Sequence, residues 1–330
     1  MLKTLFTLAL LALLALGGYA AWYVALPVSV ARLPAEVEIP AGSRFRSAAQ
    51  RLEAAGIGVG RLQFEVLARL LGRDQDIKAG SYELLSAPTP LELLDKLTRG
   101  DVTQAELRLI EGWNFRQLRA ALEGQPALRQ DTAGLSDAQI MEKLGAAGAH
   151  PEGQFYPDTY LFSKGTSDLH VLERARKAMQ RHLEREWAAR DAGVPLKSSY
   201  EALILASIVE KETGHAADRE LVAGALANRL RIGMLLQVDP SVIYGLGAAF
   251  DGNLKRIHLQ TDGPYNTYTR PGLPPTPIAA PGLASLRAAL HPAKTDALYY
   301  VAKGDGRSQF SRSLEEHNRA VRKYQLHGAR

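Results

Sequence analysis

The chain has 330 residues, enough for about two domains with a sizeable hydrophobic core. Hydrophobic residues make up 46% and charged residues 23%, which excludes a disordered, a collagen-like and a multi-span membrane protein. The net charge is only +5, and the absence of cysteine excludes disulfides, thiolate metal sites and cysteine nucleophiles. Any catalytic group must therefore be an oxygen or nitrogen side chain.

The first predicted element is a membrane-spanning helix. No charged residue lies between Lys3 and Arg32, and Leu5 to Leu26 is long enough to cross a bilayer once. This run exceeds the ~7–15-residue core of a signal peptide, so we favour an uncleaved anchor over a signal peptide cleaved after Ala20. Because Lys3 is the only charged side chain before the span, residues 1–32 are expected to be a cytoplasmic tip and anchor.

A small module is predicted over residues 33–100. Periodicity and turn residues indicate the order strand, helix, helix, strand, followed by one more helix. The expected elements are a strand at Val37–Ile39, a helix capped by Ser43 and closed by Gly56, a helix at Arg61–Leu71, a strand at Ser81–Leu85 and a helix at Pro90–Leu97.

Residues 101–330 are predicted to form an α+β body. Residues 233–281 are rich in Gly, Pro, Asn and Tyr, and such a long irregular stretch usually carries a binding surface. The other expected elements are a strand at Ala105–Ile110, a helix capped by Asn114, a long amphipathic helix from Ser167, a buried helix at Tyr200–Glu212, helices at Asp218–Ile232, Leu283–Leu290 and Ser313–Tyr324, and strands at Leu298–Ala302 and Ser308–Ser311.

Several kinds of site are excluded by their motifs. The sequence has no P-loop, no G-x-S-x-G elbow and no H-E-x-x-H. Glu212 and His215 form one E-x-x-H, whereas a di-metal carboxylate bundle needs two, so we expect neither a metal nor a cofactor. The basic residues are not interleaved with aromatic ones, which argues against nucleic-acid binding.

The strongest catalytic candidate is the segment ASIVEKETG from Ala206 to Gly214. Glu210 and Glu212 are two positions apart, so they point to different sides of the helix. The helix dipole and partial burial both raise the pKa of a carboxyl at a helix C-terminus, where Gly214 is expected as the cap. A carboxyl protonated near neutral pH is what a general acid for glycosidic cleavage requires, although both acids could equally be solvated end-of-helix residues.

The loop after this helix offers groups that bind sugars. Amide, carboxyl and hydroxyl groups can bind sugar hydroxyl and acetamido groups, and tyrosine rings can stack on sugar faces. Asp239 could instead start a helix, and Asn266 could serve only a turn. The candidates are Gln237, Asp239, Asn266 and Thr267, with Tyr244, Tyr265 and Tyr268.

These residues resemble a known family, the MltG (YceG-like) endolytic murein transglycosylases. The likeness extends over essentially the whole chain, with several long motifs in the right order. The matching segments are Ala206–Thr213, Asn228–Met234, Leu236–Gly245, Tyr265–Tyr268, Gly272–Pro275, His291–Lys294 and the pair Glu152–Gly153 and Pro157–Tyr160.

The resemblance implies a lyase that cleaves peptidoglycan strands between N-acetylmuramic acid and N-acetylglucosamine and leaves 1,6-anhydromuramyl ends. The catalytic glutamate of the family's E-K-E-T motif falls on Glu212, and Glu210 takes a supporting role. The module at 33–100 is similar to a LysM-like unit, although Pro40–Arg44 lacks the Gly-Asp-Thr of many LysM domains. The family also implies a single-pass inner-membrane protein with a periplasmic catalytic domain at 101–330, acting on nascent strands beside penicillin-binding-protein synthases.

Two other functions stay open from the sequence. A muramidase-type hydrolase would need a second functional carboxylate, for which Asp239 and Asp158 are the nearest candidates. A non-catalytic glycan-binding scaffold would show affinity without turnover and no dependence on Glu212.

Overall fold

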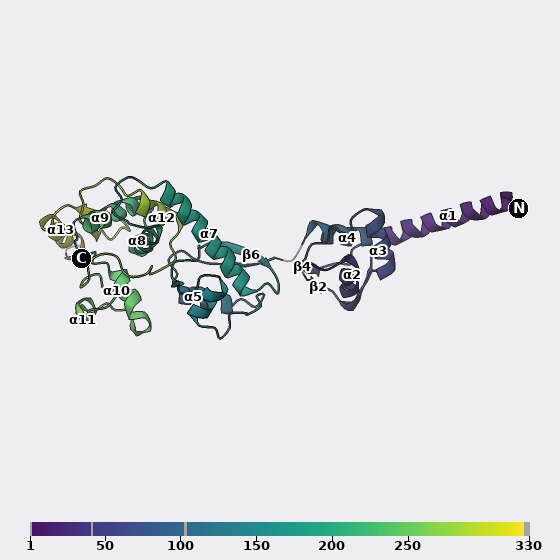
Figure 1. Cartoon of the computed structure of the whole chain (residues 1–330), viewed down its shortest axis with the longest axis horizontal. Helices are drawn as coiled ribbons and strands as arrows, with labels where there is room; N and C mark the ends of the chain where they lie inside the picture. Colours follow the sequence, from purple (N-terminus) through teal and green to yellow (C-terminus); the bar gives the residue numbers. More distant parts are fainter. Residues whose placement is uncertain (1, 41, 102–103, 327–330) are drawn as a thin grey trace. The chain divides into compact units, whose positions relative to one another are not determined.

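The computed structural model describes residues 2–40, 42–101 and 104–326 (Figure 1). The chain divides into two compact units, one of Met1–Glu106 with Leu161–Thr166 and one of Leu107–Tyr160 with Ser167–Arg330. Helices and short two-stranded ribbons alternate in both units, which confirms the predicted mixed α+β fold.

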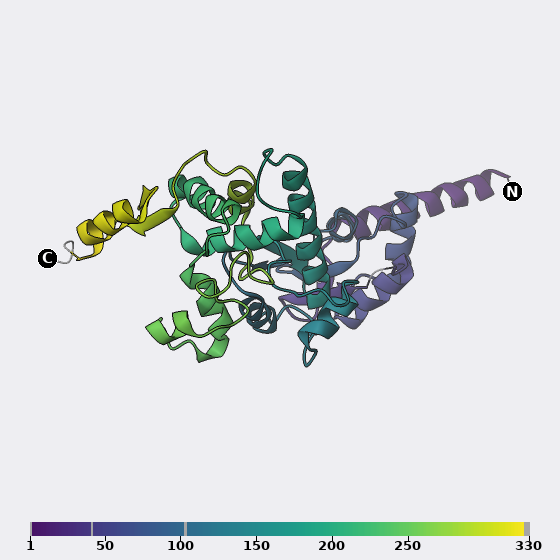
Figure 2. The ribbon, with the colours of Figure 1, turned by 60° about the vertical axis from the view of Figure 1, so that its left-hand side comes forward.

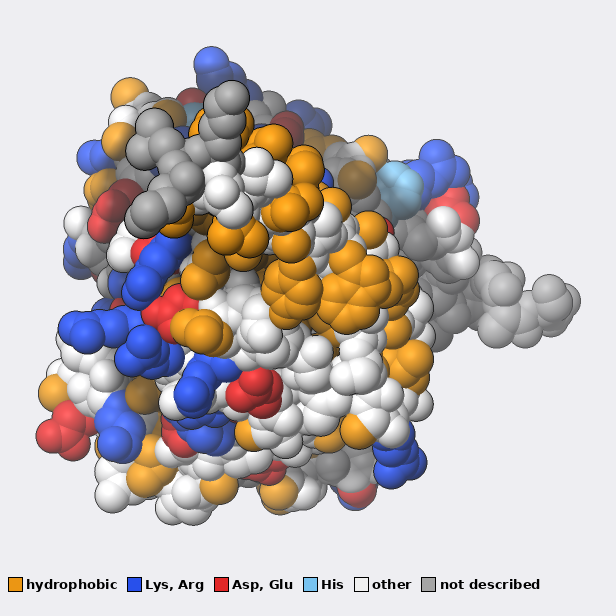
Figure 3. Space-filling view, turned by 90° about the vertical axis from the view of Figure 1, so that its right-hand side faces the viewer, with side chains coloured by type: hydrophobic (Ala, Val, Ile, Leu, Met, Phe, Trp, Pro, Cys, Tyr) orange, Lys and Arg blue, Asp and Glu red, His pale blue; other side chains and the backbone are white. Residues whose placement is uncertain are grey.

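The N-terminal helix α1 spans Leu2–Ala25. Its segment Thr4–Ala25 is long and apolar enough to cross a membrane and has no buried residue. Large apolar side chains such as Leu5, Phe6 and Leu16 are exposed along it. Figure 3 shows hydrophobic side chains gathered on the face of the first unit seen from the α1 end. An apolar surface of this kind is costly in water, which supports a membrane environment for α1.

The rest of the first unit has the predicted strand, helix, helix, strand order. Strand β2 (Ala35–Ile39) pairs antiparallel with β4 (Gly80–Leu84), with Val37 opposite Tyr82. Residues of β2 alternate between buried and exposed, so one face of the ribbon covers the core. The other elements are β1 (Ser29–Val30), α2 (Phe45–Ala54), β3 (Ile57–Gly58), α3 (Arg61–Leu70) and α4 (Pro90–Arg99).

The start of α2 differs from the prediction. Arg44 rather than Ser43 is the N-cap, and its side chain makes no capping hydrogen bond. The N–H of Ser43 donates to the carbonyl of Pro40, so this serine closes the preceding turn, one residue before the N-cap. By contrast, α4 begins with a full capping box between Thr89 and Glu92.

A further ribbon and two short helices follow along the chain. The predicted strand at Ala105–Ile110 is β5 (Gln104–Arg108). It pairs with β6 (Thr159–Ser163), a strand that the sequence did not predict. Helix α5 (Phe115–Glu123) has the predicted Asn114 cap, and the unpredicted helix α6 (Asp137–Lys143) also begins with a capping box.

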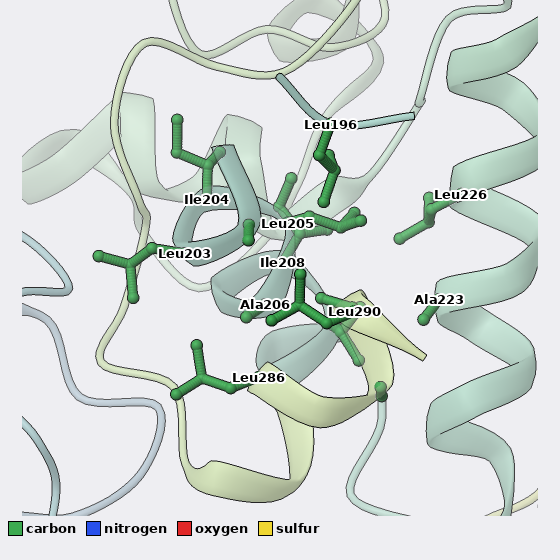
Figure 4. Packing of buried hydrophobic residues seen from close by; sticks show 14 of the residues in the cluster. Leu196, Leu203, Ile204, Leu205, Ala206, Ile208, Ala223, Leu226, Leu286 and Leu290 are labelled. Carbon is green, nitrogen blue, oxygen red and sulfur yellow. The ribbon is translucent and has the colours of Figure 1, made fainter. Parts of the chain in front are cut away.

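The core of the second unit is built around α8 (Ser199–Glu212). Residues Ala202–Val209 are all buried, as the continuous apolar run predicted. Figure 4 shows Leu205 and Ile208 of α8 among Leu226 of a neighbouring helix and Leu290 of another. Close packing of this kind fixes where the last turn of α8 lies. The helices around it are α7 (Asp168–Ala188), α9 (Arg219–Arg231) and α12 (Leu283–Leu290).

The stretch 233–281 is less irregular than predicted. It contains α10 (Asp239–Leu246) and α11 (Arg256–Gln260), which lie to one side of the helical core in Figures 1 and 2. Asp239 is the first residue of α10 and Pro240 follows it, so the open alternative of a helix start is correct. Proline and glycine therefore mark the ends of short helices here, which composition alone cannot separate from a loop.

The C-terminal part is a hairpin and a helix, as predicted. Strand β7 (Tyr299–Ala302) pairs antiparallel with β8 (Ser308–Ser311), and α13 (Leu314–Val321) follows, continued by a π-helical turn at Arg322–Leu326.

Candidate active site

Glu212 is the last residue of α8 and is half-buried. The predicted glycine cap is wrong: Thr213 is the C-cap, with extended angles of φ −146° and ψ 130°, and its N–H donates to the carbonyl of Val209. Gly214 does not have a positive φ. The chain therefore leaves the helix in an extended conformation, without the left-handed turn that a glycine cap would form after Glu212.

Burial raises the pKa of Glu212 to about 7, the direction expected from its position. The negative charge of Asp239 raises it further, whereas the Tyr300 hydroxyl and the Arg229 guanidinium lower it. A substantial fraction of Glu212 is therefore protonated near neutral pH, which is the state that a general acid needs.

Tyr300 and Arg229 are partners of Glu212 that were not among the site residues predicted from the sequence. The Tyr300 hydroxyl donates to Glu212 Oε2 at 2.9 Å. The Oε1 atom accepts no hydrogen bond from any residue that the structure describes. No local signal links these residues, because Tyr300 lies on β7, 88 positions further along the chain.

Arg229 joins three segments around Glu212. Its side chain is only 6% exposed, and its Nε donates to the carbonyl of Leu298 at 2.6 Å. Its Nη1 donates to the carbonyl of Leu236 at 2.5 Å, and its guanidinium lies over the ring of Tyr299. Arg229 thus holds the start of β7 and the segment before α10 against the end of α9.

Asp239 and Tyr268 lie together beside Glu212. The Tyr268 hydroxyl donates to Asp239 Oδ1 at 2.5 Å. Burial raises the pKa of this tyrosine, and the hydrogen bond to Asp239 and the charges of Asp239 and Glu212 raise it further. Gln237 is exposed and has φ +50°, which non-glycine residues rarely adopt. Its N–H donates to the carbonyl of Thr267 at 3.0 Å. This hydrogen bond joins the segment before α10 to the segment that carries Tyr268.

Asn266 and Thr267 are buried and shape this loop from within. The Asn266 side-chain amide donates to the carbonyls of His258, Leu259 and Thr261, and its Oδ1 accepts the N–H of Tyr268 at 2.9 Å. The Thr267 hydroxyl accepts the N–H of Val238. The polar groups of Asn266 are engaged inside the protein, and they position Tyr268.

Tyr265 and Tyr244 belong to a second cluster around Glu152. Their rings meet edge to face at 4.9 Å, and the Tyr265 hydroxyl is 2.9 Å from the hydroxyl of Thr276. The Tyr244 hydroxyl donates to Glu152 Oε2 at 3.0 Å, and the N–H of Phe115 donates to both carboxyl oxygens of Glu152. Glu152 is 3% exposed, and burial raises its pKa to about 7.

The other acids considered from the sequence make different contacts. Glu210 points away from Glu212 and accepts the N–H of Gly282, the N-cap of α12, at 3.0 Å. Asp158 is exposed, accepts the N–H of Thr159, and lies near Tyr160 rather than in the Glu212 group. Among the described residues, no three His, Asp or Glu side chains are grouped to hold a metal ion.

Comparison with known proteins finds relatives along most of the chain. The sequence model of the YceG-like family matches residues 37–323. An endolytic murein transglycosylase of Bacillus subtilis is 32% identical over 305 residues, which cover 87% of this chain and 84% of the relative. A second one, from Streptococcus pneumoniae, is 29% identical over 357 residues, covering 95% of this chain and 63% of the relative.

A solved structure is also similar. The crystal structure of a yceG-like protein from Listeria monocytogenes matches with a TM-score of 0.56 and 32% identity, and the match covers 86% of this chain and 97% of the other.

Proposed function

The chain belongs to the YceG-like family, and we propose that it is a membrane-anchored endolytic murein transglycosylase with Glu212 as its catalytic group. The expectation of an enzyme of the lyase class is confirmed by its curated relatives, which are endolytic murein transglycosylases. The observation that supports Glu212 most is its geometry: Tyr300 holds one carboxyl oxygen, the other accepts no hydrogen bond from the described residues, and the pKa lies near 7.

The proposed reaction uses one carboxyl twice. Protonated Glu212 donates its proton to the oxygen of N-acetylglucosamine as the bond from C1 of N-acetylmuramic acid to that oxygen breaks. The resulting carboxylate then takes the proton of the C6 hydroxyl of the same muramic acid, whose oxygen bonds to C1. No water is consumed, Glu212 ends protonated as it began, and the product end is 1,6-anhydromuramyl. The acetamido group of the sugar stabilises the positive charge at C1, as in substrate-assisted glycosidases.

The residues around Glu212 divide into three roles in this proposal. Tyr300 and Arg229 set the position and pKa of the acid. Asp239, Tyr268 and the exposed Gln237 border the glycan path, where their amide, carboxyl and ring groups contact the sugar. Asn266 positions Tyr268, and Glu210 supports the site by holding the start of α12, whereas Tyr265 lies with the Glu152 cluster and is not part of this path.

The layout of the chain is likewise proposed. Residues 1–32 form a cytoplasmic tip and one inner-membrane span, residues 33–100 a LysM-like module, and residues 101–330 a periplasmic catalytic domain. The apolar helix α1, which has no charged side chain over Thr4–Ala25, and the β2, α2, α3, β4 order support this assignment. An anchored catalytic domain suits cleavage of nascent strands, which terminates their elongation next to penicillin-binding-protein synthases.

Mass spectrometry of products tests the function. The detergent-solubilised chain and its Glu212→Gln variant are incubated with uncrosslinked glycan strands, and Glu184→Gln, an exposed change on α7, is the matched control. We expect anhydro-ended fragments from the wild type and the control, and a rate roughly 10²–10⁴ lower from Glu212→Gln, the usual contribution of a general acid or base.

Other outcomes each point to an alternative. Full activity of a folded Glu212→Gln variant would remove Glu212 from catalysis. Fragments with free reducing ends would indicate the muramidase alternative, with Asp239 the nearest second carboxylate. Binding without any fragments from the wild type would indicate the non-catalytic scaffold.

A further inference from the structure

A pocket of about 790 Å³ lies on the second unit and has no role in the mechanism above. Its rim comes from the first residues of α5, from Lys211 of α8 and from α10. Glu152 and Tyr265 also line it. The volume is in the range of known small-ligand pockets, roughly 300–1,000 Å³.

The unneutralised charges in this pocket are positive. Arg116 and Lys211 both line it, and neither pairs with a carboxylate among the residues that the structure describes. The two acids of the lining are already occupied, since Asp137 pairs with Arg119 and Glu152 accepts the Phe115 N–H. Burial lowers the pKa of His150, which also lines the pocket. The pocket therefore favours an anionic ligand.

Part of the pocket wall is apolar and aromatic. It is formed by Ile243 and Tyr244 of α10, with Phe250 and Tyr265. Tyr244 is held at this wall by its hydrogen bond to Glu152 and its edge-to-face contact with Tyr265. A lining that combines cations with apolar and aromatic side chains suits a short peptide that carries carboxylates and small alkyl side chains.

Two residues that line the pocket are direct chain neighbours of residues in the Glu212 group. Lys211 lines the pocket and is the residue before Glu212, and Pro240 lines it and follows Asp239. In peptidoglycan, an acidic peptide stem branches from the lactyl group of the same muramic acid whose C1 reacts. A stem attached to a sugar at Glu212 therefore starts close to this pocket.

We propose that this pocket binds the carboxylates of the peptide stem on the muramic acid at the cleaved bond, with Arg116 and Lys211 as the cationic contacts. This inference rests on the proposed function. It makes stem-bearing strands better substrates than peptide-free strands, because the stem adds charge-assisted contacts that a bare glycan lacks.

The test compares two uncrosslinked substrates, stem-bearing strands and the same strands stripped of peptide by an amidase. The measured quantity is the ratio of kcat/KM for stem-bearing to peptide-free strands, with the full chain in detergent. We expect a ratio well above one for the wild type and a fall of roughly tenfold in Arg116→Ala, the size of one lost hydrogen bond to a charged group. Arg116→Lys should recover part of it, because the charge is kept.

A control and a second readout keep the result interpretable. Arg181→Ala, an exposed change on α7, should leave the ratio at the wild-type value. In the inactive Glu212→Gln background, Arg116→Ala should weaken binding of stem-bearing strands by a similar factor, measured by calorimetry. An unchanged ratio in both Arg116→Ala and Lys211→Ala, or a wild-type ratio of one, overturns the stem pocket while leaving the transglycosylase intact. Absence of fragments from both substrates with the wild type overturns the proposed function and this inference together.

Discussion

At the scale of single residues, two glutamates of the second unit share a raised pKa and differ in what their oxygens do. Burial raises the pKa of both Glu152 and Glu212 to about 7. Both oxygens of Glu152 accept hydrogen bonds from Phe115, and one also from Tyr244, whereas Tyr300 is the single donor to Glu212 in the part of the chain that the structure describes. A carboxyl with a free oxygen can exchange a proton with substrate, and one with both oxygens occupied serves to hold its neighbours in place.

Tyr300 should control the pH dependence of turnover. A general acid works in its protonated form, so activity falls as the pH rises through the pKa of Glu212, near 7. The Tyr300 hydrogen bond stabilises the charged carboxylate and lowers that pKa, so Tyr300→Phe should raise it and move the alkaline limb to higher pH. Rate profiles from pH 5 to 9 check this, with Tyr299→Phe as the matched control. An alkaline limb that stays in place, or moves to lower pH, contradicts the assignment.

Glu152 should make the second unit less stable at alkaline pH. Its pKa is about 7 in the folded chain against 4.5 for the exposed group, so the folded state binds the proton more tightly. The stabilisation is complete below pH 4.5 and is lost as the pH rises through 7, by about 3 kcal/mol in the free energy of unfolding. Urea unfolding at pH 5 and pH 8 should show this difference shrinking in Glu152→Gln but not in the exposed Glu184→Gln. Equal pH dependence in the wild type and Glu152→Gln would argue against it.

At the scale of elements, the site depends on a close packing of α9 against the segment that leads into β7. Asn228 donates to the carbonyls of Thr295 and Ala297, and Arg229 donates to that of Leu298. These bonds set the start of the hairpin that carries Tyr300. The position of Glu212 is set separately by the buried helix α8, so the Tyr300–Glu212 contact reports whether the two elements are correctly docked.

Gly224 on α9 provides a test of this docking. A Cβ at this position would lie 2.6 Å from the carbonyl oxygen of Ala293 and 2.9 Å from Thr295 Cγ2, closer than such atoms approach. Gly224→Ala should therefore lose about 1–3 kcal/mol of stability despite the better helix propensity of alanine, because the contact is with backbone. Turnover should fall as well, since the shift reaches Tyr300. The control is Gly263→Ala, whose Cβ meets nothing within 4 Å, and thermal unfolding is the measurement. A fully stable and active Gly224→Ala variant would show that the segment at Ala293 and Thr295 moves aside without loss of stability.

At the scale of the whole molecule, α1 is the one described helix that is both long and apolar enough to cross a membrane. It adds no side chain to the Glu212 group, so anchoring and catalysis are separable properties of the chain. In the proposed function, α1 restricts the enzyme to strands near the membrane.

Removing α1 should separate location from activity. A variant lacking residues 1–26 should move from the membrane fraction to the soluble fraction and should keep its rate on isolated strands, because no part of the site is lost. Carbonate extraction and product analysis measure the two properties. The intact mass of the membrane-extracted wild type distinguishes an anchor from a signal peptide: a mass short of the first 20 residues would show cleavage.

The sequence by itself determined the features that depend on local pattern. The charge-free run of α1, the continuous apolar face of Ala202–Val209 and the Asn114 cap all follow from neighbouring residues, and all three are found in the structure. Local pattern also gave Glu210 and Glu212 as candidate acids at the end of a buried helix, and the family resemblance selected Glu212 between them. Local pattern was misleading where turn residues were dense, as at Ser43 and in the stretch that holds α10.

Only the tertiary structure decided which groups face Glu212. Tyr300 and Arg229 reach it from β7 and α9, and nothing in the residues near them signals the contact. The fold also separated the predicted binding residues, placing Tyr268 and Asp239 beside Glu212 and Tyr265 with Tyr244 at the Glu152 pocket. The physical reason is that hydrogen bonds and burial act through space, and the packing of α8, α9 and the hairpin determines which distant residues meet.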